Sequence, residues 1–159
     1  MTPIPTLDDL RAEEARLVLD RFDYAAAHRL GLRLYERAAE RTLPIAIEVT
    51  HGATPVFFAL MPGATPDNVD WVRRKRAVAL RFHRSSLFLR LECESKGVEF
   101  HARYGLAAAD YVASGGSVPL VVRGVGVVGT STVSGLPDVE DHRLVTSALL
   151  DLGMTPKSP

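Results

Sequence analysis

Apolar positions in the first forty residues recur at the spacing of a helix. The segment TLDDLRAEEARLVLDRF starts with Thr6 and Asp9, which are spaced as a capping box with aspartate in place of glutamate. Its apolar residues fall near one face, which predicts a helix over residues 6–22. Asp23 is a good helix cap, and a second helix is predicted from there to about residue 41. Gly31 inside this second helix costs roughly 1 kcal/mol relative to alanine, which indicates close packing at that point.

Strict alternation replaces the helical period in the next segment. In PIAIEVTHG, Ile45, Ile47 and Val49 alternate with other residues, which is the pattern of a half-buried strand. TPVFFALMPG is a short apolar run bounded by turn residues, and it predicts a second strand. The linking THGATP has the length of a hairpin loop, so we expect the two strands to be antiparallel neighbours.

The rest of the chain alternates between helical and strand patterns. Residues 67–82 and a segment reaching about residue 96 are predicted as helices, with a break near Ser85 and Ser86. Residues 98–116 give no clear pattern. SVPLVV and VVGTSTVSG predict two strands, and a final helix is predicted over residues 137–152.

Three glycines near the last two strands, Gly124, Gly126 and Gly129, spell G-x-G-x-x-G, the pattern of a dinucleotide-binding loop. That loop requires a helix after the glycines, because the helix N-terminus meets the pyrophosphate. Here β-branched valines and threonines follow, and these favour a strand. The acidic residue expected about 20 positions later is also missing, since Leu149 and Leu150 stand there. We therefore predict a hairpin turn at Gly124–Gly126 and no binding of NAD.

Composition is that of an ordinary soluble protein. The 159 residues are 47% hydrophobic and 24% charged, with 19 basic and 19 acidic side chains. This predicts one domain over residues 1–159, with residues 154–159 as a disordered tail. Zero net charge and the lack of a long apolar run argue against nucleic acid and membrane as partners. No signal-peptide pattern is visible and Cys93 is the single cysteine, so we expect a cytoplasmic protein without an internal disulfide.

The helix predicted over residues 67–82 carries a basic run, Arg73 to Arg76. Helical spacing disperses these residues around the axis, and no aromatic residues interleave with them, which argues against a nucleic-acid surface. Lys75, however, falls on the largely apolar stripe of this helix. Two interpretations remain open. Either the lysine reaches solvent or pairs with an acid, or it is held in a partly dry place where it binds an anion.

The final helix also carries candidate chemistry. Asp138 and His142 are four residues apart and share a face, and a carboxylate beside an imidazole can bind a metal or exchange protons. The alternative is that Asp138, Glu140 and Asp141 complement the helix dipole and that His142 is a surface histidine. These three carboxylates would repel a phosphate at this helix end. The other histidines are isolated, so no metal site is predicted.

Several motifs in combination resemble a known family. They are PGATPDNVDWVRRKR, RSS, YVASGGSVPLVV and GVVGTSTVSGLPDVEDHRLV, and the likeness extends over nearly the whole chain. Together they are similar to the haem-degrading-domain family, and more closely to the branch of it known only as an uncharacterised protein family. The motif positions are Asn68, Trp71, Arg74, Lys75, Ser85, Ser86, Gly115, Gly116, Gly135, Asp141 and His142.

The resemblance implies a profilin-like α/β fold, in which an antiparallel sheet of about five strands has helices on both sides. It also implies a homodimer or higher homo-oligomer, because relatives form dimers that build into larger assemblies. Some members of the wider family bind haem and release its iron, whereas the closer branch has no settled activity.

Three functions follow as hypotheses. The first is binding of a small anionic ligand, with haem or another tetrapyrrole as a candidate and with Lys75 facing its carboxylate. The second is a haem-degrading or other redox enzyme, for which no catalytic residue is assigned. The third is an oligomeric scaffold without a small ligand. For the first function, the residues expected to converge on one cleft are Asn68, Lys75, Gly115, Gly116, Ser117, Asp141 and His142.

Overall fold

The computed structural model describes residues 2–154, so the tail predicted at 154–159 lies outside them except for Met154. The helices are α1 (Leu7–Arg16), α2 (Tyr24–Glu40), α3 (Pro66–Phe82), α4 (Ser86–Ser95), α5 (Phe100–Tyr104) and α6 (Asp138–Met154). The strands are β1 (Ala46–His51), β2 (Thr54–Leu60), β3 (Ser117–Val122) and β4 (Gly126–Ser134).

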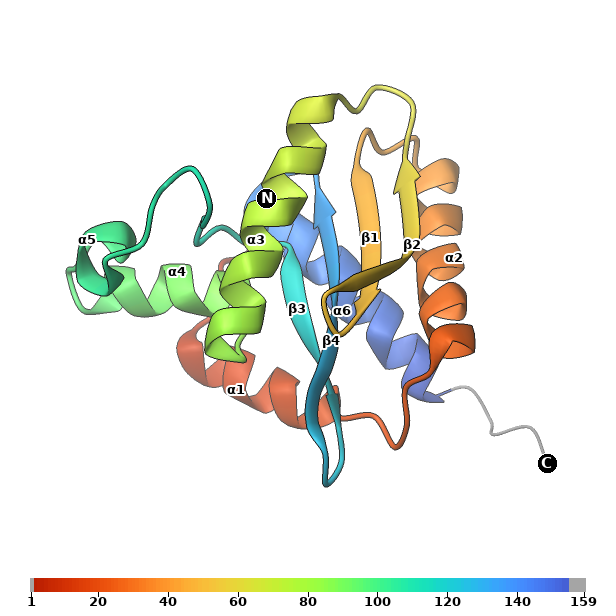
Figure 1. Cartoon of the computed structure of the whole chain (residues 1–159), viewed down its shortest axis with the longest axis horizontal. Coiled ribbons are helices and arrows are strands. Elements are labelled where there is room, and N and C mark those ends of the chain that lie inside the picture. Colours follow the sequence, from red (N-terminus) through yellow and green to blue (C-terminus); the bar gives the residue numbers. More distant parts are fainter. Residues whose placement is uncertain (1, 155–159) are drawn as a thin grey trace.

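The four strands form one antiparallel sheet in the order β2-β1-β4-β3, with helices on both sides (Figure 1). The helices α2 and α6 pack together over one face, whereas α3 crosses the opposite face over β4 and β3. The fold class predicted from the sequence is therefore confirmed. Among the described residues, no helix is long and apolar enough to cross a membrane.

The predicted helix starts are confirmed by their caps. Thr6 accepts a hydrogen bond from the Asp9 backbone N–H at 3.1 Å, and the Asp9 carboxylate accepts from the Thr6 N–H at 2.8 Å. At the second helix, Asp23 accepts from the Ala26 N–H at 2.8 Å. Gly31 has the close-packing role expected of it, because a β-carbon there would overlap a side-chain ring of β2.

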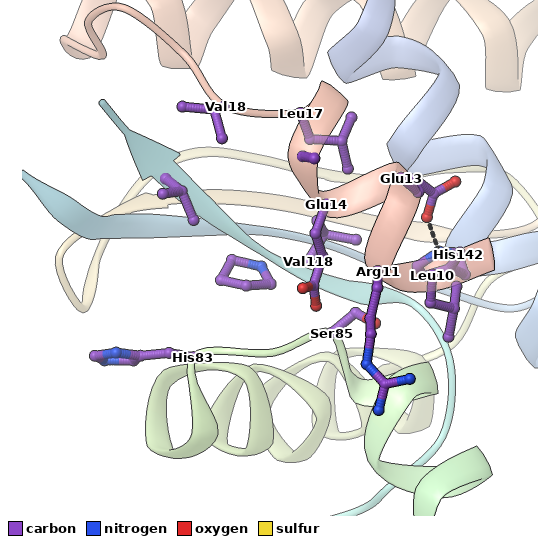
Figure 2. Close-up of a pocket in the computed structure, with 13 residues that line it drawn as sticks. Leu10, Arg11, Glu13, Glu14, Leu17, Val18, His83, Ser85, Val118 and His142 are labelled. Carbon is purple, nitrogen blue, oxygen red and sulfur yellow. Dashed lines mark hydrogen bonds and ion pairs between the residues drawn. The ribbon is translucent and has the colours of Figure 1, made fainter. Parts of the chain in front are cut away.

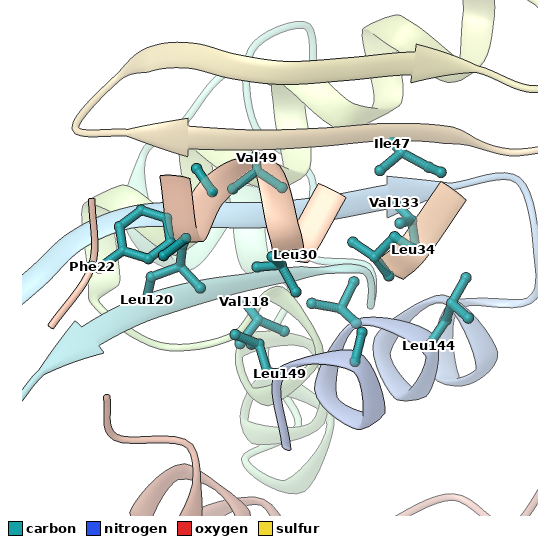
Figure 3. Close-up of a cluster of buried hydrophobic side chains, with 14 of the residues drawn as sticks. Phe22, Leu30, Leu34, Ile47, Val49, Val118, Leu120, Val133, Leu144 and Leu149 are labelled. Atoms are coloured by element: carbon teal, nitrogen blue, oxygen red, sulfur yellow. The ribbon is translucent and has the colours of Figure 1, made fainter. Parts of the chain in front are cut away.

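The main hydrophobic core lies between the sheet and the α2–α6 layer (Figure 3). Leu30 and Leu34 of α2 point onto Ile47 of β1 and Val133 of β4, and all four side chains are fully buried. A second cluster on the other side holds α1 and α4 together. Its fully or nearly fully buried members are Leu10, Val78, Leu87, Phe88, Leu89, Cys93, Phe100 and Val139.

Two expectations from the sequence need correction. The described residues contain four strands rather than about five. The helix predicted over residues 6–22 ends at Arg16, and beyond it Leu19 forms a parallel bridge with Val122 of β3. The reason lies in the core, because Leu19 and Phe22 are both buried in the α2–α6 side of the sheet. An extended segment brings them there while adding backbone hydrogen bonds to β3.

The glycine-rich stretch forms the predicted hairpin. Gly124 and Gly126 have φ values of +74° and +109°, which favour glycine, and β3 and β4 pair antiparallel around them. Gly129 has a different role, because a β-carbon there would overlap the carbonyl group of Thr50 in β1. The pattern G-x-G-x-x-G thus arises from a turn and a close strand contact, and a strand rather than a helix follows it.

Candidate functional site

Lys75 lies on the face of α3 that packs against the sheet, and only 2% of it is exposed. Its Nζ donates to the Asp141 carboxylate at 2.9 Å and to the Val133 carbonyl at 3.3 Å. The first of the two interpretations left open by the sequence, pairing with an acid, is therefore what the structure contains. An anionic ligand at Lys75 would have to displace an internal carboxylate.

Asp141 links three elements through the same carboxylate. Besides Lys75 of α3, it accepts hydrogen bonds from the backbone N–H groups of Gly135 at 3.3 Å and Leu136 at 3.0 Å. Burial raises the pKa of Asp141 from 3.8 to about 6, and the nearby Lys75 ammonium and the backbone donors oppose that rise. The group fixes the turn between β4 and α6 against α3, which is a structural task.

The glycine pair before β3 lies against this charge pair. A β-carbon at Gly116 would stand 2.8 Å from the Lys75 Nζ, so the absence of a side chain lets the ammonium reach its place. The Gly115 N–H donates to Asp138 at 3.1 Å, and Asp138 is also paired with Arg90. The backbone N–H of Gly115 is thus already occupied within the chain.

A shallow cavity of about 260 Å³ adjoins the pair. Its walls include Asn68, Trp71, Lys75, Gly135 and Asp141, so five of the motif residues lie around it. Asn68 itself accepts a hydrogen bond from the Thr65 N–H at 2.9 Å at the start of α3. The cavity holds a neutralised charge pair rather than a free cation, which makes it a weak anion site.

The basic run in α3 is likewise matched by acids. Arg73 and Arg74 both contact Asp70, at 2.8 Å and 2.9 Å, and Arg74 also stacks on the Trp71 ring. Arg76 contacts the largely buried Glu48 of β1 at 2.6 Å. Each positive charge of the run therefore has a carboxylate partner within the chain.

Ser117 does not line the Lys75 cavity. Its backbone N–H donates to the Ser86 Oγ at 3.0 Å, and its own Oγ shares a hydrogen bond of 2.8 Å with Thr132. All three residues are buried. These hydrogen bonds join α4, β3 and β4. Ser117 and Ser86, the second serine of the RSS motif, therefore position the sheet rather than a ligand.

His142 turns away from Asp138 and from the Lys75 cavity. Its Nε2 lies 2.6 Å from a carboxylate oxygen of Glu13 in α1, and its side chain is 3% exposed. Its Nδ1 is buried and has no hydrogen-bond partner among the described residues. Asp138 pairs with Arg90 instead, so the pair suggested by the four-residue spacing is not formed. Within the described chain, no group of three or more His, Cys, Asp or Glu side chains is arranged to hold a metal ion.

His142 belongs to the wall of a larger cavity between α1, β3 and the end of α3 (Figure 2). The cavity measures about 350 Å³, within the range of small-molecule sites. We call it the α1–β3 cavity. Its lining residues are Leu10, Arg11, Glu13, Glu14, Ala15, Leu17, Val18, His83, Ser85, Val118, Pro119, Val121 and His142.

Glu14, which is partly exposed, contributes a second buried polar atom to this wall. One carboxylate oxygen accepts from Arg84 at 2.9 Å, whereas the other, Oε1, is buried without a partner among the described residues. Burial raises the pKa of Glu14, and the Arg84 guanidinium opposes that rise. Two residues lining one cavity thus each carry an unsatisfied polar atom, which is rare in folded proteins.

The sequence interpretation assigned no role to Glu13 and Glu14. A signal was present, because they follow the buried Leu10 by three and four residues and so share its face of α1. The same kind of signal, a charge on an apolar stripe, had drawn attention to Lys75. What the sequence does not contain is the packing of α1 against α4 and beside His142 of α6, which gives these acids their neighbours.

Comparison with known proteins gives one family. Residues 22–150 match the family model described as haem degrading protein HbpS-like. A UPF0303 protein of Rhizobium rhizogenes is 49% identical over 156 residues, covering 96% of this chain and 94% of its own length. A UPF0303 protein of Paraburkholderia phymatum is 44% identical, covering 90% and 87% of the two chains. The α1 wall of the cavity lies before the residues that the family model matches.

Solved structures agree on the fold. The crystal structure of Ybr137w protein superposes with a TM-score of 0.84 at 28% identity, covering 94% of this chain and 88% of that one. The PduOC:heme complex superposes with a TM-score of 0.69 at 19% identity, covering 80% and 92%. At that identity the second comparison supports the fold alone.

Proposed function

Because the chain belongs to the HbpS-like family of haem-degrading proteins and to its UPF0303 branch, we propose that it binds a small ligand of the tetrapyrrole class in the α1–β3 cavity. The single observation that carries this proposal is that His142, which lines the cavity, has a buried Nδ1 without a hydrogen-bond partner among the described residues. Leaving such a group unsatisfied costs about 1–3 kcal/mol, so a bound partner is expected to compensate it.

The residues present fit a haem-like group. Apolar side chains such as Leu10, Leu17 and Val118 suit the hydrophobic body of a macrocycle. The bond between His142 and Glu13 resembles the arrangement in which a carboxylate orients a metal-ligating imidazole. His142 would then hold the iron, and the iron would supply the redox chemistry of the family. PduOC, a protein of similar fold, forms a complex with haem.

In this cavity a cation other than Lys75 would bind the anionic group expected of the ligand. Lys75 is committed to Asp141, whereas Arg11 lines the α1–β3 cavity and is half exposed in an i,i+3 pair with Asp8. Pairs of this kind between exposed groups are weak, so Arg11 is available to a carboxylate of the ligand. Its neighbour in space, Arg84, neutralises Glu14 at the same wall.

The test is a titration of haem into the protein, followed by its Soret absorption. We expect saturation at one equivalent for the wild type and for His28→Gln, which removes an exposed histidine on α2 outside the cavity lining. His142→Gln should weaken haem binding at least tenfold. Iron-free protoporphyrin should bind the wild type and His142→Gln alike, because it fills the cavity without needing the imidazole.

Each outcome selects among the three hypotheses. Binding without loss of the Soret band identifies a binding protein, whereas release of iron in the presence of a reductant identifies the enzyme. If neither haem nor protoporphyrin changes its spectrum with the wild type, the proposal is wrong and the oligomeric scaffold is the remaining hypothesis. Equal haem affinity in His142→Gln and wild type would move the site away from this cavity.

A further inference from the structure

The shallow cavity beside the Lys75–Asp141 pair has polar walls that come from four parts of the chain. Asn68 and Lys75 belong to α3, and Ser114 belongs to the loop before β3. Ser134 ends β4, and Asp141 lies in the first turn of α6. We call this the α3–α6 cavity. Its volume of about 260 Å³ lies below the roughly 300–1,000 Å³ of drug-sized sites, so it suits only a small ligand.

Lys75 retains an unused hydrogen-bond donor at this cavity. A lysine ammonium has three N–H groups, and two of them have acceptors in the Asp141 carboxylate and the Val133 carbonyl. No third acceptor bonds to the Nζ among the described residues, and the Trp71 ring centroid is 6.0 Å away, at the limit of a cation–π contact. Because the side chain is only 3% exposed, a group bound in the cavity is the partner that the third N–H lacks.

Ser134 contributes a second unused group. The residue is 4% exposed, and its hydroxyl forms no hydrogen bond within the described chain. Val133 points into the core on the α2–α6 side, and neighbours along a strand point to opposite faces, so Ser134 points to the side of α3. Within the same part of the chain, the Ser114 hydroxyl and the amide N–H groups of Asn68 also have no partner. Such unpaired polar groups around one cavity are rare in folded proteins.

The balance of donors and charges in the walls selects the kind of ligand. The unused groups are mainly donors, whereas the two carboxylates of the lining are already engaged. Asp141 accepts from Lys75 and from two backbone N–H groups, and Asp138 pairs with Arg90 and accepts from the Gly115 N–H. Excess donors require a ligand with excess acceptors. An anion would lie beside two carboxylates, which repel it. A neutral carbonyl oxygen accepts two hydrogen bonds and brings no charge.

We propose that the α3–α6 cavity binds a small uncharged amide whose carbonyl oxygen accepts hydrogen bonds from Lys75 and Ser134. An alcohol brings a donor with every acceptor, and the walls have few acceptors left to match it. The apolar part of the amide lies against Trp71 and Leu136, which also line the cavity. The described linings of this cavity and of the α1–β3 cavity share no residue, so the inference does not depend on a tetrapyrrole ligand.

The test uses probes of nearly equal shape and different charge. Trp71 is the single tryptophan of the chain, so its indole N–H gives one NMR signal that reports on this cavity. We expect propionamide to shift this signal saturably in the millimolar range, whereas propionate and glycerol do not. Absence of a saturable shift with propionamide overturns the proposal. Propionate or glycerol binding as tightly as propionamide also overturns it, and assigns the cavity to anions or to hydroxyl compounds.

Two serines of β4 provide a matched pair of variants. The hydroxyls of Ser131 and Ser134 both lack a partner within the described chain, but the two residues are three apart and so face opposite sides of the sheet. Ser134→Ala should weaken propionamide binding about threefold to tenfold, the effect of one neutral hydrogen bond. Ser131→Ala should leave it unchanged. Wild-type affinity in Ser134→Ala, or an equal loss in both variants, contradicts the assigned position.

Discussion

Replacing Lys75 with methionine tests whether the family's motif lysine has a structural role. The variant leaves the Asp141 carboxylate buried without its cation, since the two side chains are 3% and 1% exposed. Breaking a buried pair by removing one partner costs about 3–5 kcal/mol. That is a large part of the 5–15 kcal/mol by which domains of this kind are stable. We expect Lys75→Met to lower the free energy of unfolding by this amount at pH 8.

The dependence on pH follows from the raised pKa of Asp141. In the wild type this pKa is about 6 in the folded state against 3.8 in the unfolded state, because burial disfavours the charge. Between these values the folded protein holds a proton that the unfolded chain has released, so stability falls as pH rises. Because the two pKa values differ by about 2, the free energy of unfolding changes by at most roughly 3 kcal/mol over this pH range. Without Lys75 the pKa of Asp141 rises further, so the loss in Lys75→Met shrinks toward pH 5.

Urea denaturation at pH 8 and pH 5 measures both effects. Arg73→Met is the matched control, because Arg73 lies on the same helix but forms an exposed pair with Asp70; it should change stability by under about 0.5 kcal/mol. The double variant Lys75→Met with Asp141→Asn removes both charges and should recover much of the loss. The reasoning is refuted if Lys75→Met lowers the free energy of unfolding by less than about 1 kcal/mol at pH 8 and this loss is no smaller at pH 5.

Three further outcomes are expected. Gly31→Ala gains helix propensity but places a β-carbon within the Phe57 ring, so we expect the free energy of unfolding measured in urea to fall by about 1–3 kcal/mol. An increase in stability would show instead that α2 can shift to make room. Burial raises the pKa of the Cys93 thiol, so its reaction with a thiol reagent at pH 7 should be much slower in the native protein than in urea; equal rates would contradict a packed α4. Calorimetry with NAD should show no micromolar binding, and binding that Gly126→Asp abolishes in a folded protein would restore the nucleotide interpretation.

The local elements could be predicted because their causes lie within a few residues. Caps at Thr6 and Asp23, strand alternation around Ile47, and the turn at Gly124 to Gly126 each act locally, and each element is observed. The failure at residues 17–22 has the opposite cause. Their helical spacing is real, but the edge of β3, about a hundred residues later, offers hydrogen bonds and burial that outweigh it.

The candidate site could be predicted only in part. The sequence correctly singled out Lys75 as a charge on an apolar face and grouped it with Gly116 and Asp141, which the structure brings into contact. It could not show that the acid would come from within the chain and neutralise the lysine. Nor could it show that His142, one residue after Asp141, turns to Glu13 on the opposite side.

By itself, then, the sequence determined the periodicities, caps and turns, the absence of a helix after the glycines, and the family resemblance carried by its motifs. Tertiary structure alone decided which charges meet and which polar atoms are left without partners. The reason is that Lys75 and Asp141 are 66 residues apart and Glu13 and His142 are 129 apart. At such separations contacts are set by the stacking of helices on the sheet, and no local pattern encodes it.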